Sequence, residues 1–119
     1  VLDKQGGPNH VGNFCGAPIM IDTDSGYVYY TPVYYVLAQL SRTIRPGDTA
    51  VQTERRLDGL DNDALHASAA VNDDGLLTVQ LLNTTKEPLS FGLQIGPQYA
   101  QVDMPANALQ TVRVQLPQN

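Results

Sequence analysis

The spacing of apolar residues changes near residue 49 and divides the chain into two parts. Before this point, apolar side chains recur at intervals of three and four, at Val33, Val36, Leu37, Leu40 and Ile44. This stripe is typical of an amphipathic helix. Thr31 and Pro32 predict its start, because threonine can cap the first turn and proline loses no needed N–H at the first helical position. The run Arg45-Pro46-Gly47-Asp48 predicts its end.

From residue 49 onward the pattern predicts short strands separated by turns. Asn72-Asp73-Asp74-Gly75 is a strong hairpin signal, because Asn, Asp and Gly tolerate positive φ. After it, Leu77, Val79 and Leu81 alternate with other residues and fall on one face of a strand. The expected strands cover residues 50–55, 64–71, 76–82, 89–95, 98–104 and 109–116. Five or six strands spaced by about 8–12 residues predict an antiparallel β-sandwich.

The first third of the chain predicts a single strand and helix. Residues 17–22 are an apolar run that we expect to form a short buried strand, and residues 22–26 form a cluster of turn formers. One strand and one helix cannot make a parallel sheet alone, so this unit needs a surface that the sequence does not contain. The predicted fold is mainly β, with an antiparallel β-sandwich (46–119) preceded by a single strand–helix unit (1–45).

Composition excludes several classes of function. The chain has 119 residues and a formal net charge of -5, and its seven basic residues are scattered apart from the pair Arg55-Arg56. Nucleic-acid binding is therefore not expected. No apolar run approaches the ~18–20 residues that span a bilayer. No signal peptide is visible either, which leaves the compartment open, with a secreted or periplasmic parent among the alternatives. His10 and His66 lie far apart, so we expect neither a metal site nor a cofactor.

Few residues offer catalytic chemistry. The two glutamates, Glu54 and Glu87, lie in charged or turn segments without a second acid nearby. Glycosidic hydrolysis needs two flanking carboxylates, so neither is expected to be catalytic. Asp22 and Asp24 could form an acid pair, but capping of a turn is favoured. Cys15 lies five positions after His10, but we expect a small buried thiol there rather than a nucleophile.

Two further patterns have an ordinary structural interpretation beside a functional one. Five of the six tyrosines cluster in one stretch, at Tyr27, Tyr29, Tyr30, Tyr34 and Tyr35. They could form a platform for sugars, but packing against a neighbouring domain is favoured. Asn83-Thr84-Thr85 matches the N-glycosylation pattern, and a turn stabilised by the asparagine side chain explains it equally well.

The strongest signal is the loop ahead of the first strand. It reads Gly6-Gly7-Pro8-Asn9-His10-Val11-Gly12-Asn13-Phe14, followed by Ala17-Pro18-Ile19-Met20-Ile21-Asp22. These motifs closely resemble the C-terminal part of glycoside hydrolase family 30, which includes glucosylceramidases and bacterial β-glycosidases. The resemblance continues through Tyr34-Tyr35, Ser41, Ile44-Arg45-Pro46-Gly47, Asp73-Asp74-Gly75 and Leu81-Leu82-Asn83, and thus covers nearly the whole chain.

This resemblance implies that the catalytic residues and the β-sandwich belong to different parts of the parent protein. Members of the family have a (β/α)8 barrel that carries two catalytic glutamates on earlier strands, with a β-sandwich packed on its side. Residues 1–45 would be the last βα element of the barrel, and both glutamates would lie upstream of Val1. The chain alone is then expected to be an inactive part of a retaining β-glycosidase, acting on glucosylceramide-like glycosides or β-glucans.

The same resemblance implies a set of substrate contacts. Asn13 and Phe14 match residues that line the sugar pocket of glucosylceramidases, and Cys15 takes a neighbouring lining position. His10 replaces a bulkier tryptophan of the glucosylceramidase motif, and Cys15-Gly16 replaces larger or more polar residues. No catalytic residue is expected within the chain.

Two alternatives remain open from the sequence. The chain could be a free-standing β-sandwich module that binds carbohydrate or protein through its tyrosine cluster. Alternatively, its uncovered strand and helix could associate with a second copy rather than with a catalytic barrel, since large exposed apolar patches are rare on monomers.

Overall fold

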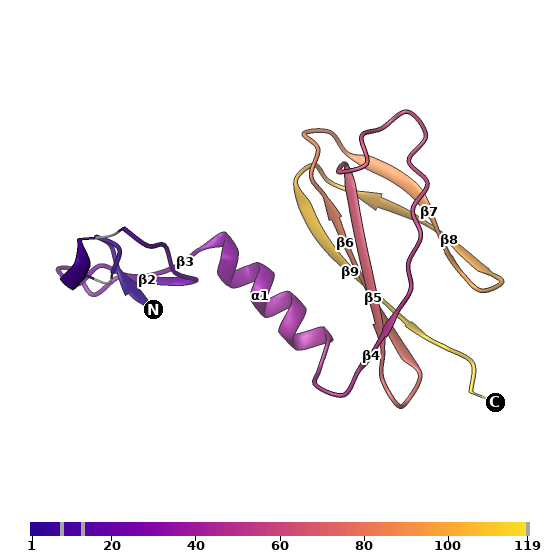
Figure 1. The fold of residues 1–119 in the computed structure, drawn as a ribbon, viewed down its shortest axis with the longest axis horizontal. Coiled ribbons are helices and arrows are strands. Elements are labelled where there is room, and N and C mark those ends of the chain that lie inside the picture. The colour runs from indigo at the N-terminus through magenta and orange to yellow at the C-terminus, as the bar shows by residue number, and fades with distance from the viewer. Residues whose placement is uncertain (8, 13, 119) are drawn as a thin grey trace. The chain divides into compact units, whose positions relative to one another are not determined.

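The computed structural model describes residues 1–7, 9–12 and 14–118. They form two compact units, Val1–Arg42 and Thr43–Asn119. In chain order the elements are β1 (Leu2–Asp3), the 3-10 helix η1 (Asn9–Val11), β2 (Ile19–Ile21), β3 (Val28–Tyr30), α1 (Pro32–Thr43), β4 (Thr49–Val51), β5 (Leu65–Val71), β6 (Leu76–Asn83), β7 (Leu89–Ile95), β8 (Gln98–Met104) and β9 (Ala108–Gln115) (Figure 1). None of the helices in the described part of the chain has the length and apolar character needed to cross a membrane.

The first unit contains a small mixed sheet in the order β1-β2-β3. β1 pairs parallel to β2, and β2 pairs antiparallel to β3. The strand predicted over 17–22 is therefore present, but it is shorter and only half-buried. Its burial is incomplete because its sheet has only two short neighbours and β3 is itself exposed.

Helix α1 begins at Pro32, as the sequence predicts. The Thr31 carbonyl accepts the Tyr34 N–H at 2.9 Å, and the Thr31 hydroxyl donates to the carbonyl oxygens of Ala17 and Pro18 at 3.1 and 3.0 Å. The threonine thus joins the start of the helix to the segment that enters β2. None of the twelve residues of α1 is buried, although its apolar stripe is present as predicted.

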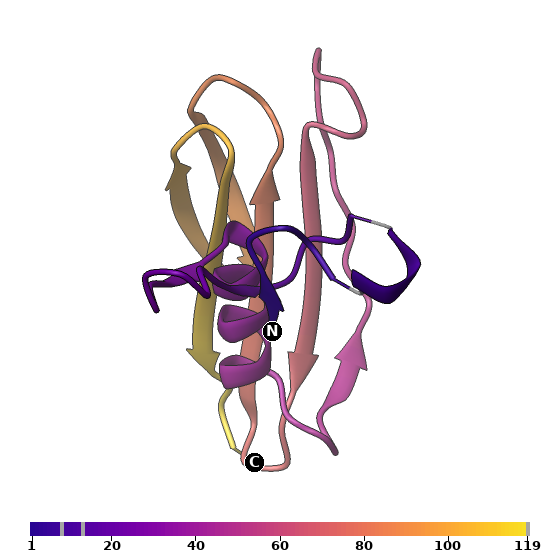
Figure 2. The same cartoon turned by 90° about the vertical axis from the view of Figure 1, so that its left-hand side faces the viewer.

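The second unit is a β-sandwich of two antiparallel sheets. One sheet has the order β4-β5-β6-β9 and the other consists of β7 and β8. Within this unit the ribbon of β7 and β8 lies against the sheet that contains β5, β6 and β9 (Figures 1 and 2). The predicted turn after β5 forms around Gly75, whose φ is +76° and whose N–H donates to the Asn72 carbonyl at 3.0 Å.

The core of the sandwich lies between the two sheets. Its buried members come from both sheets and are Leu65, Ala69, Leu77, Val79, Leu81, Val102 and Met104. Inward residues of β7 pack against this cluster at Leu89, Phe91, Leu93 and Ile95, in the alternation that the sequence predicts. The mainly β fold with an antiparallel sandwich is therefore confirmed.

The central strand β6 is buried on both faces, and its second face is polar. Thr78 donates to the Thr43 carbonyl at 3.1 Å, and Gln80 Nε2 donates to Thr43 Oγ1 at 2.7 Å. Thr111 Oγ1 donates to Gln80 Oε1 at 2.6 Å. Burial of these polar groups is tolerated because each has a hydrogen-bond partner.

Strand β4 is shorter than the strand predicted over 50–55. Only Thr49–Val51 pairs with β5. Beyond it, side chains replace the backbone ladder: Thr53 Oγ1 donates to the Ala67 carbonyl at 3.2 Å, and the Arg55 guanidinium donates to the carbonyls of Asn62 and Leu65. These contacts satisfy edge carbonyls of β5 without continuing the strand.

Candidate functional site

The candidate site is the loop between β1 and β2. Gly6 and Gly7 are buried, whereas His10, Val11 and Gly12 are exposed on the η1 segment. Gly6 adopts φ +74°, and its N–H donates to the Asp3 carbonyl at 3.0 Å. A left-handed conformation favours glycine because a side chain there meets the backbone. Gly6 therefore lies at the tight turn by which the loop leaves β1.

The Phe14 ring closes the loop by lying against Gly6. A Cβ atom built on Gly6 would meet Phe14 Cδ2 at 2.5 Å. The ring still leaves 71% of Phe14 exposed, so it presents an open apolar surface beside a rigid turn. Gly6 thus has two requirements that only glycine meets: a positive φ and the space that the ring occupies.

The three predicted pocket residues differ in how far the structure describes and exposes them. Phe14 is exposed and packed on Gly6, and Cys15 is half-buried, less covered than the buried thiol that we expected. Asn13 lies outside the described residues. The two glutamates belong to the sandwich unit, where both Glu54 and Glu87 are exposed.

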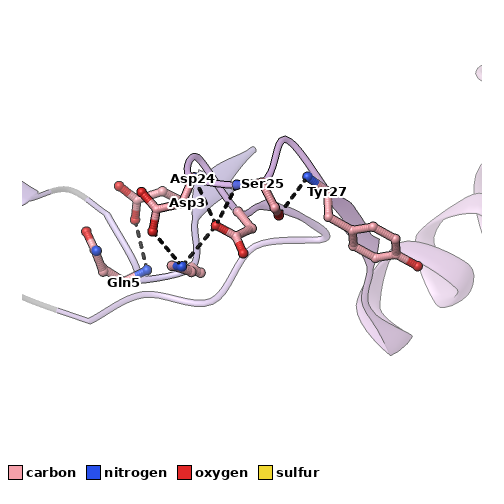
Figure 3. A network of polar contacts seen from close by, with 7 residues as sticks. Asp3, Gln5, Asp24, Ser25 and Tyr27 are labelled. Carbon is pink, nitrogen blue, oxygen red and sulfur yellow. Dashed lines mark hydrogen bonds and ion pairs between the residues drawn. The ribbon is translucent and has the colours of Figure 1, made fainter.

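A charged cluster braces the base of the loop (Figure 3). Lys4 follows β1, and its Nζ lies 2.9 Å from a carboxylate oxygen of Asp22 and 2.9 Å from one of Asp24. Its backbone N–H donates to the Ile21 carbonyl at 2.9 Å, so Lys4 is held by both main chain and side chain. This lysine ties the beginning of the loop to the turn that follows β2.

The two aspartates form a turn, which the sequence favoured over an acid pair. Asp22 Oδ1 accepts the backbone N–H of Asp24 at 3.0 Å and that of Ser25 at 3.4 Å. The hydrogen bond from Lys4, followed by that from the Asp24 N–H, lowers the pKa of Asp22 from 3.8 to about 2. The same carboxylates raise the pKa of Lys4, with the Asp24 hydrogen bond the largest cause. Asp22 is therefore ionised at neutral pH and acts as a brace.

Sequence reasoning missed Lys4. Its partners lie 18 and 20 positions away, so no local pattern reveals the contact. The parallel pairing of Leu2 with Met20 and of Asp3 with Ile21 brings the two strand ends together. Only this pairing indicates that Lys4 reaches Asp22.

Both histidines are exposed. Among residues 1–7, 9–12 and 14–118, no group of three or more His, Cys, Asp or Glu side chains is arranged to hold a metal ion. The polar groups at the loop thus offer hydrogen bonding and an apolar ring face, but no set of metal ligands within the described residues.

The tyrosine cluster of the first unit forms two groups of ring contacts, one of Tyr27 with Tyr29 and one of Tyr34 with Tyr30 and Tyr35. Ring centroids lie 4.6 Å apart for Tyr27 and Tyr29, 4.7 Å for Tyr30 and Tyr34, and 5.3 Å for Tyr34 and Tyr35. Neighbouring apolar residues of α1 are also exposed, at Val33, Val36 and Leu37. The first unit therefore exposes several large apolar and aromatic side chains that lie close together in sequence.

Two domains of one protein family match the chain, and the boundary between them lies where the spacing of apolar residues changes. Residues 1–44 match the TIM-barrel domain of glycosyl hydrolase family 30, and residues 49–112 match the β-sandwich domain of the same family. The chain belongs to glycoside hydrolase family 30. Along this chain the barrel match comes first and the sandwich match second.

A curated relative supports the family assignment, and two solved structures share the fold. The lysosomal acid glucosylceramidase of Mus musculus is 33% identical over 86 residues, which are 72% of this chain and 16% of that protein. The crystal structure of SrfJ from Salmonella typhimurium superposes with a TM-score of 0.87 at 23% identity, covering 98% of this chain and 25% of that chain. The endo-β1,6-glucanase BT3312 gives a TM-score of 0.74 at 24% identity, covering 94% and 25%.

The two structural likenesses support the fold alone. The chain spans between 15% and 18% of the length of the curated relatives that it matches. The comparisons therefore establish membership of the family, and the sandwich formed by the second unit agrees with the family's β-sandwich domain.

Proposed function

We propose that this chain is the C-terminal part of a retaining β-glycosidase, to which it contributes a substrate-pocket loop and an accessory β-sandwich. Residues 1–45 complete the barrel, and residues 46–119 form the sandwich. The substrate class is a β-glycoside, either a glucosylceramide-like glycoside or a β-glucan. The observation that carries the proposal is the consecutive match of both family 30 domains to one short chain.

The loop has the chemistry of a sugar contact. The exposed Phe14 ring offers a flat surface for the apolar face of a pyranose. In the proposal Asn13 uses its amide to donate to one sugar hydroxyl and accept from another. Cys15 lines the neighbouring position. None of these three groups supplies the proton transfer or the nucleophile that bond cleavage needs.

The catalytic carboxylates are proposed to lie upstream of Val1. A retaining glycosidase needs two carboxyl groups about 5–5.5 Å apart, one as nucleophile and one as acid and base. The only glutamates here are Glu54, in the long loop after β4, and Glu87, in the turn before β7. Both are exposed. This supports a site whose carboxylates come from elsewhere.

Kinetics of the intact polypeptide test the proposal. We expect the intact polypeptide to hydrolyse an aryl β-glucoside with retention of anomeric configuration. Proton NMR of the first-formed sugar product measures that configuration. Phe14→Ala should lower kcat/KM, whereas Leu60→Ala, at an exposed position of the second unit, should leave it unchanged. Inversion of configuration, or equal kcat/KM for Phe14→Ala and the wild type, would contradict the proposed mechanism or the proposed role of the loop.

The exposed surface of the first unit supports a proposal about partners. The tyrosines of the cluster and the apolar residues of α1 form a surface that water contacts in the isolated chain. We expect the barrel to cover it in the intact protein and a second copy to cover it in the isolated chain. Sedimentation velocity should then show association that increases with concentration. A strictly monomeric profile with an ordered helix would contradict this expectation.

A further inference from the structure

The outward face of the β7–β8 ribbon is polar except for one aromatic ring. Three directly paired positions form it: Ser90 with Asp103, Gly92 with Gln101, and Gln94 with Tyr99. All six residues are exposed. The opposite face of the ribbon packs into the core of the sandwich through the alternate residues of β7 and through Val102 and Met104 of β8, so this face belongs to a packed element.

The Tyr99 ring extends across β7 to Gly92, which lies diagonally opposite it in the ribbon. A Cβ atom built on Gly92 would meet the Tyr99 hydroxyl oxygen at 2.0 Å and ring atoms at 2.4 and 2.5 Å. The missing side chain at Gly92 is thus the space that the end of the ring fills. Tyr99 nevertheless remains 73% exposed, the highest fraction among its large apolar and aromatic residues. The end of the ring thus lies over Gly92, and most of the ring is open to water.

The polar groups beside the ring are held in place by each other. Ser90 Oγ donates to Asp103 Oδ1 at 2.6 Å, and Gln101 Nε2 donates to the same oxygen at 3.2 Å. These two hydrogen bonds, that of Ser90 first, lower the pKa of the Asp103 carboxyl. The second carboxylate oxygen and the Gln101 carbonyl oxygen keep acceptor capacity for hydroxyl donors.

We propose that this face, centred on Tyr99 with Gln101 and Asp103 beside it, is a binding surface for a neutral β-linked glucan chain. A flat ring with one open face suits the apolar face of a sugar, and amide and carboxylate groups alongside suit its hydroxyls. None of the six residues is a cation, and one is a carboxylate, so an anionic polymer is disfavoured on this face. The choice of a β-linked glucan rests on the proposed function, whereas the surface itself rests on the geometry.

Affinity electrophoresis of the full chain in gels with soluble β-1,3-glucan or β-1,6-glucan tests the proposal. We expect retardation by at least one of them and weaker or no retardation by the α-linked dextran. Loss of the ring in Tyr99→Ala should weaken binding about two- to twelvefold, since a stacked aromatic contributes roughly 0.5–1.5 kcal/mol and 1.4 kcal/mol is tenfold. Tyr99→Phe should retain binding, because the ring remains.

Two glycine substitutions, Gly92→Ala and Gly16→Ala, test whether binding needs the position of the Tyr99 ring as well as its presence. Gly92→Ala keeps Tyr99 but forces the ring off the sheet, and alanine is tolerated in a strand at least as well as glycine. We expect it to weaken binding, whereas Gly16→Ala, where an added Cβ meets nothing within 4 Å, should not. Circular dichroism of each variant confirms that the sandwich is folded.

Several results would overturn the proposal. They are absence of retardation by both β-glucans, retardation unchanged in Tyr99→Ala, equal retardation by dextran, and an equal loss in Tyr35→Ala, which would transfer binding to the tyrosines of the first unit. The assay requires no hydrolysis. A failure of binding therefore leaves the kinetic test of the glycosidase unaffected, and the converse also holds.

Discussion

Replacement of Gly6 by alanine tests how the loop is built. Gly6 has φ +74°, and the left-handed conformation costs a residue with a Cβ about 1–2 kcal/mol. The added Cβ would also lie 2.5–2.9 Å from three carbon atoms of the Phe14 ring. Ordinary contacts lie near 3.5–4.0 Å, so the ring must move by about 1 Å. Since Phe14 is exposed, we expect this clash to be relieved by displacement of the ring.

Two other glycines provide matched controls. Gly12 has φ +62° with nothing within 4 Å of an added Cβ, so Gly12→Ala carries the conformational cost without the clash. Gly16 has the same open space, and its φ is not positive, so Gly16→Ala carries neither. The three substitutions thus separate backbone strain from displacement of Phe14.

Hydrogen exchange and NMR give the two readouts. A cost of 1–2 kcal/mol should speed amide exchange in the loop by about 5–30-fold in both Gly6→Ala and Gly12→Ala, and leave it unchanged in Gly16→Ala. Only Gly6→Ala should change the ring signals of Phe14, and in the intact enzyme only Gly6→Ala should lower kcat/KM toward the value of Phe14→Ala. Identical Phe14 signals in Gly6→Ala and Gly12→Ala would refute the reasoning.

Two further predictions concern stability. Asn83 is fully buried, and its amide bonds to the carbonyls of Glu87 and Pro105 and accepts from Thr85. Asn83→Ala removes these hydrogen bonds at a fully buried position and should lower the free energy of unfolding, measured in urea, by about 2–4 kcal/mol, against less than about 0.5 kcal/mol for the exposed Asn62→Ala. Because the pKa of Asp22 is lowered to about 2 from 3.8, its stabilisation is complete above pH 3.8 and is lost as the pH falls through 2. Exchange protection of the loop should decline in that window, and Lys4→Met should lower the protection at pH 7 and flatten the decline; an unchanged profile would contradict the bracing role.

The regular part of the fold follows from local patterns. The alternation of Leu89, Phe91, Leu93 and Ile95 predicts β7 to the residue, and the turn before Leu76 follows from the φ that Gly75 tolerates. Both signals concern neighbouring residues, whose side chains alternate between the faces of a strand. Such patterns predict where an element lies, because the backbone alone sets the repeat.

Contacts between distant residues could not be predicted in this way. The ion pairs of Lys4, the hydrogen bonds of Gln80 to Thr43 and Thr111, and the packing of Tyr99 on Gly92 depend on strand order and register. The early end of β4 also depends on such contacts, because the side chains of Thr53 and Arg55 donate hydrogen bonds to carbonyl oxygens of β5 in place of a further strand. At the site, the loop and its residue types follow from sequence, whereas its bracing does not.

The buried asparagine illustrates a pattern with two interpretations that structure separates. Asn83-Thr84-Thr85 matches a glycosylation acceptor, yet the Asn83 side chain is 0% exposed and its Nδ2 donates to two carbonyls at 2.9 and 2.8 Å. The Thr85 N–H donates to Asn83 Oδ1 at 2.9 Å, which is the turn that the sequence offered as the alternative. In the folded sandwich this nitrogen is a structural group.

The most direct test of the account is the hydrolysis of an aryl β-glucoside by the purified 119-residue chain and by the intact polypeptide under the same conditions. The account predicts no turnover above buffer for the isolated chain and clear turnover for the intact polypeptide, because the proposal assigns the carboxylates to a segment upstream of Val1 and only sugar contacts to the loop. Turnover by the isolated chain that is abolished in Glu54→Gln or Glu87→Gln would place the catalytic carboxylates within this chain and contradict the account.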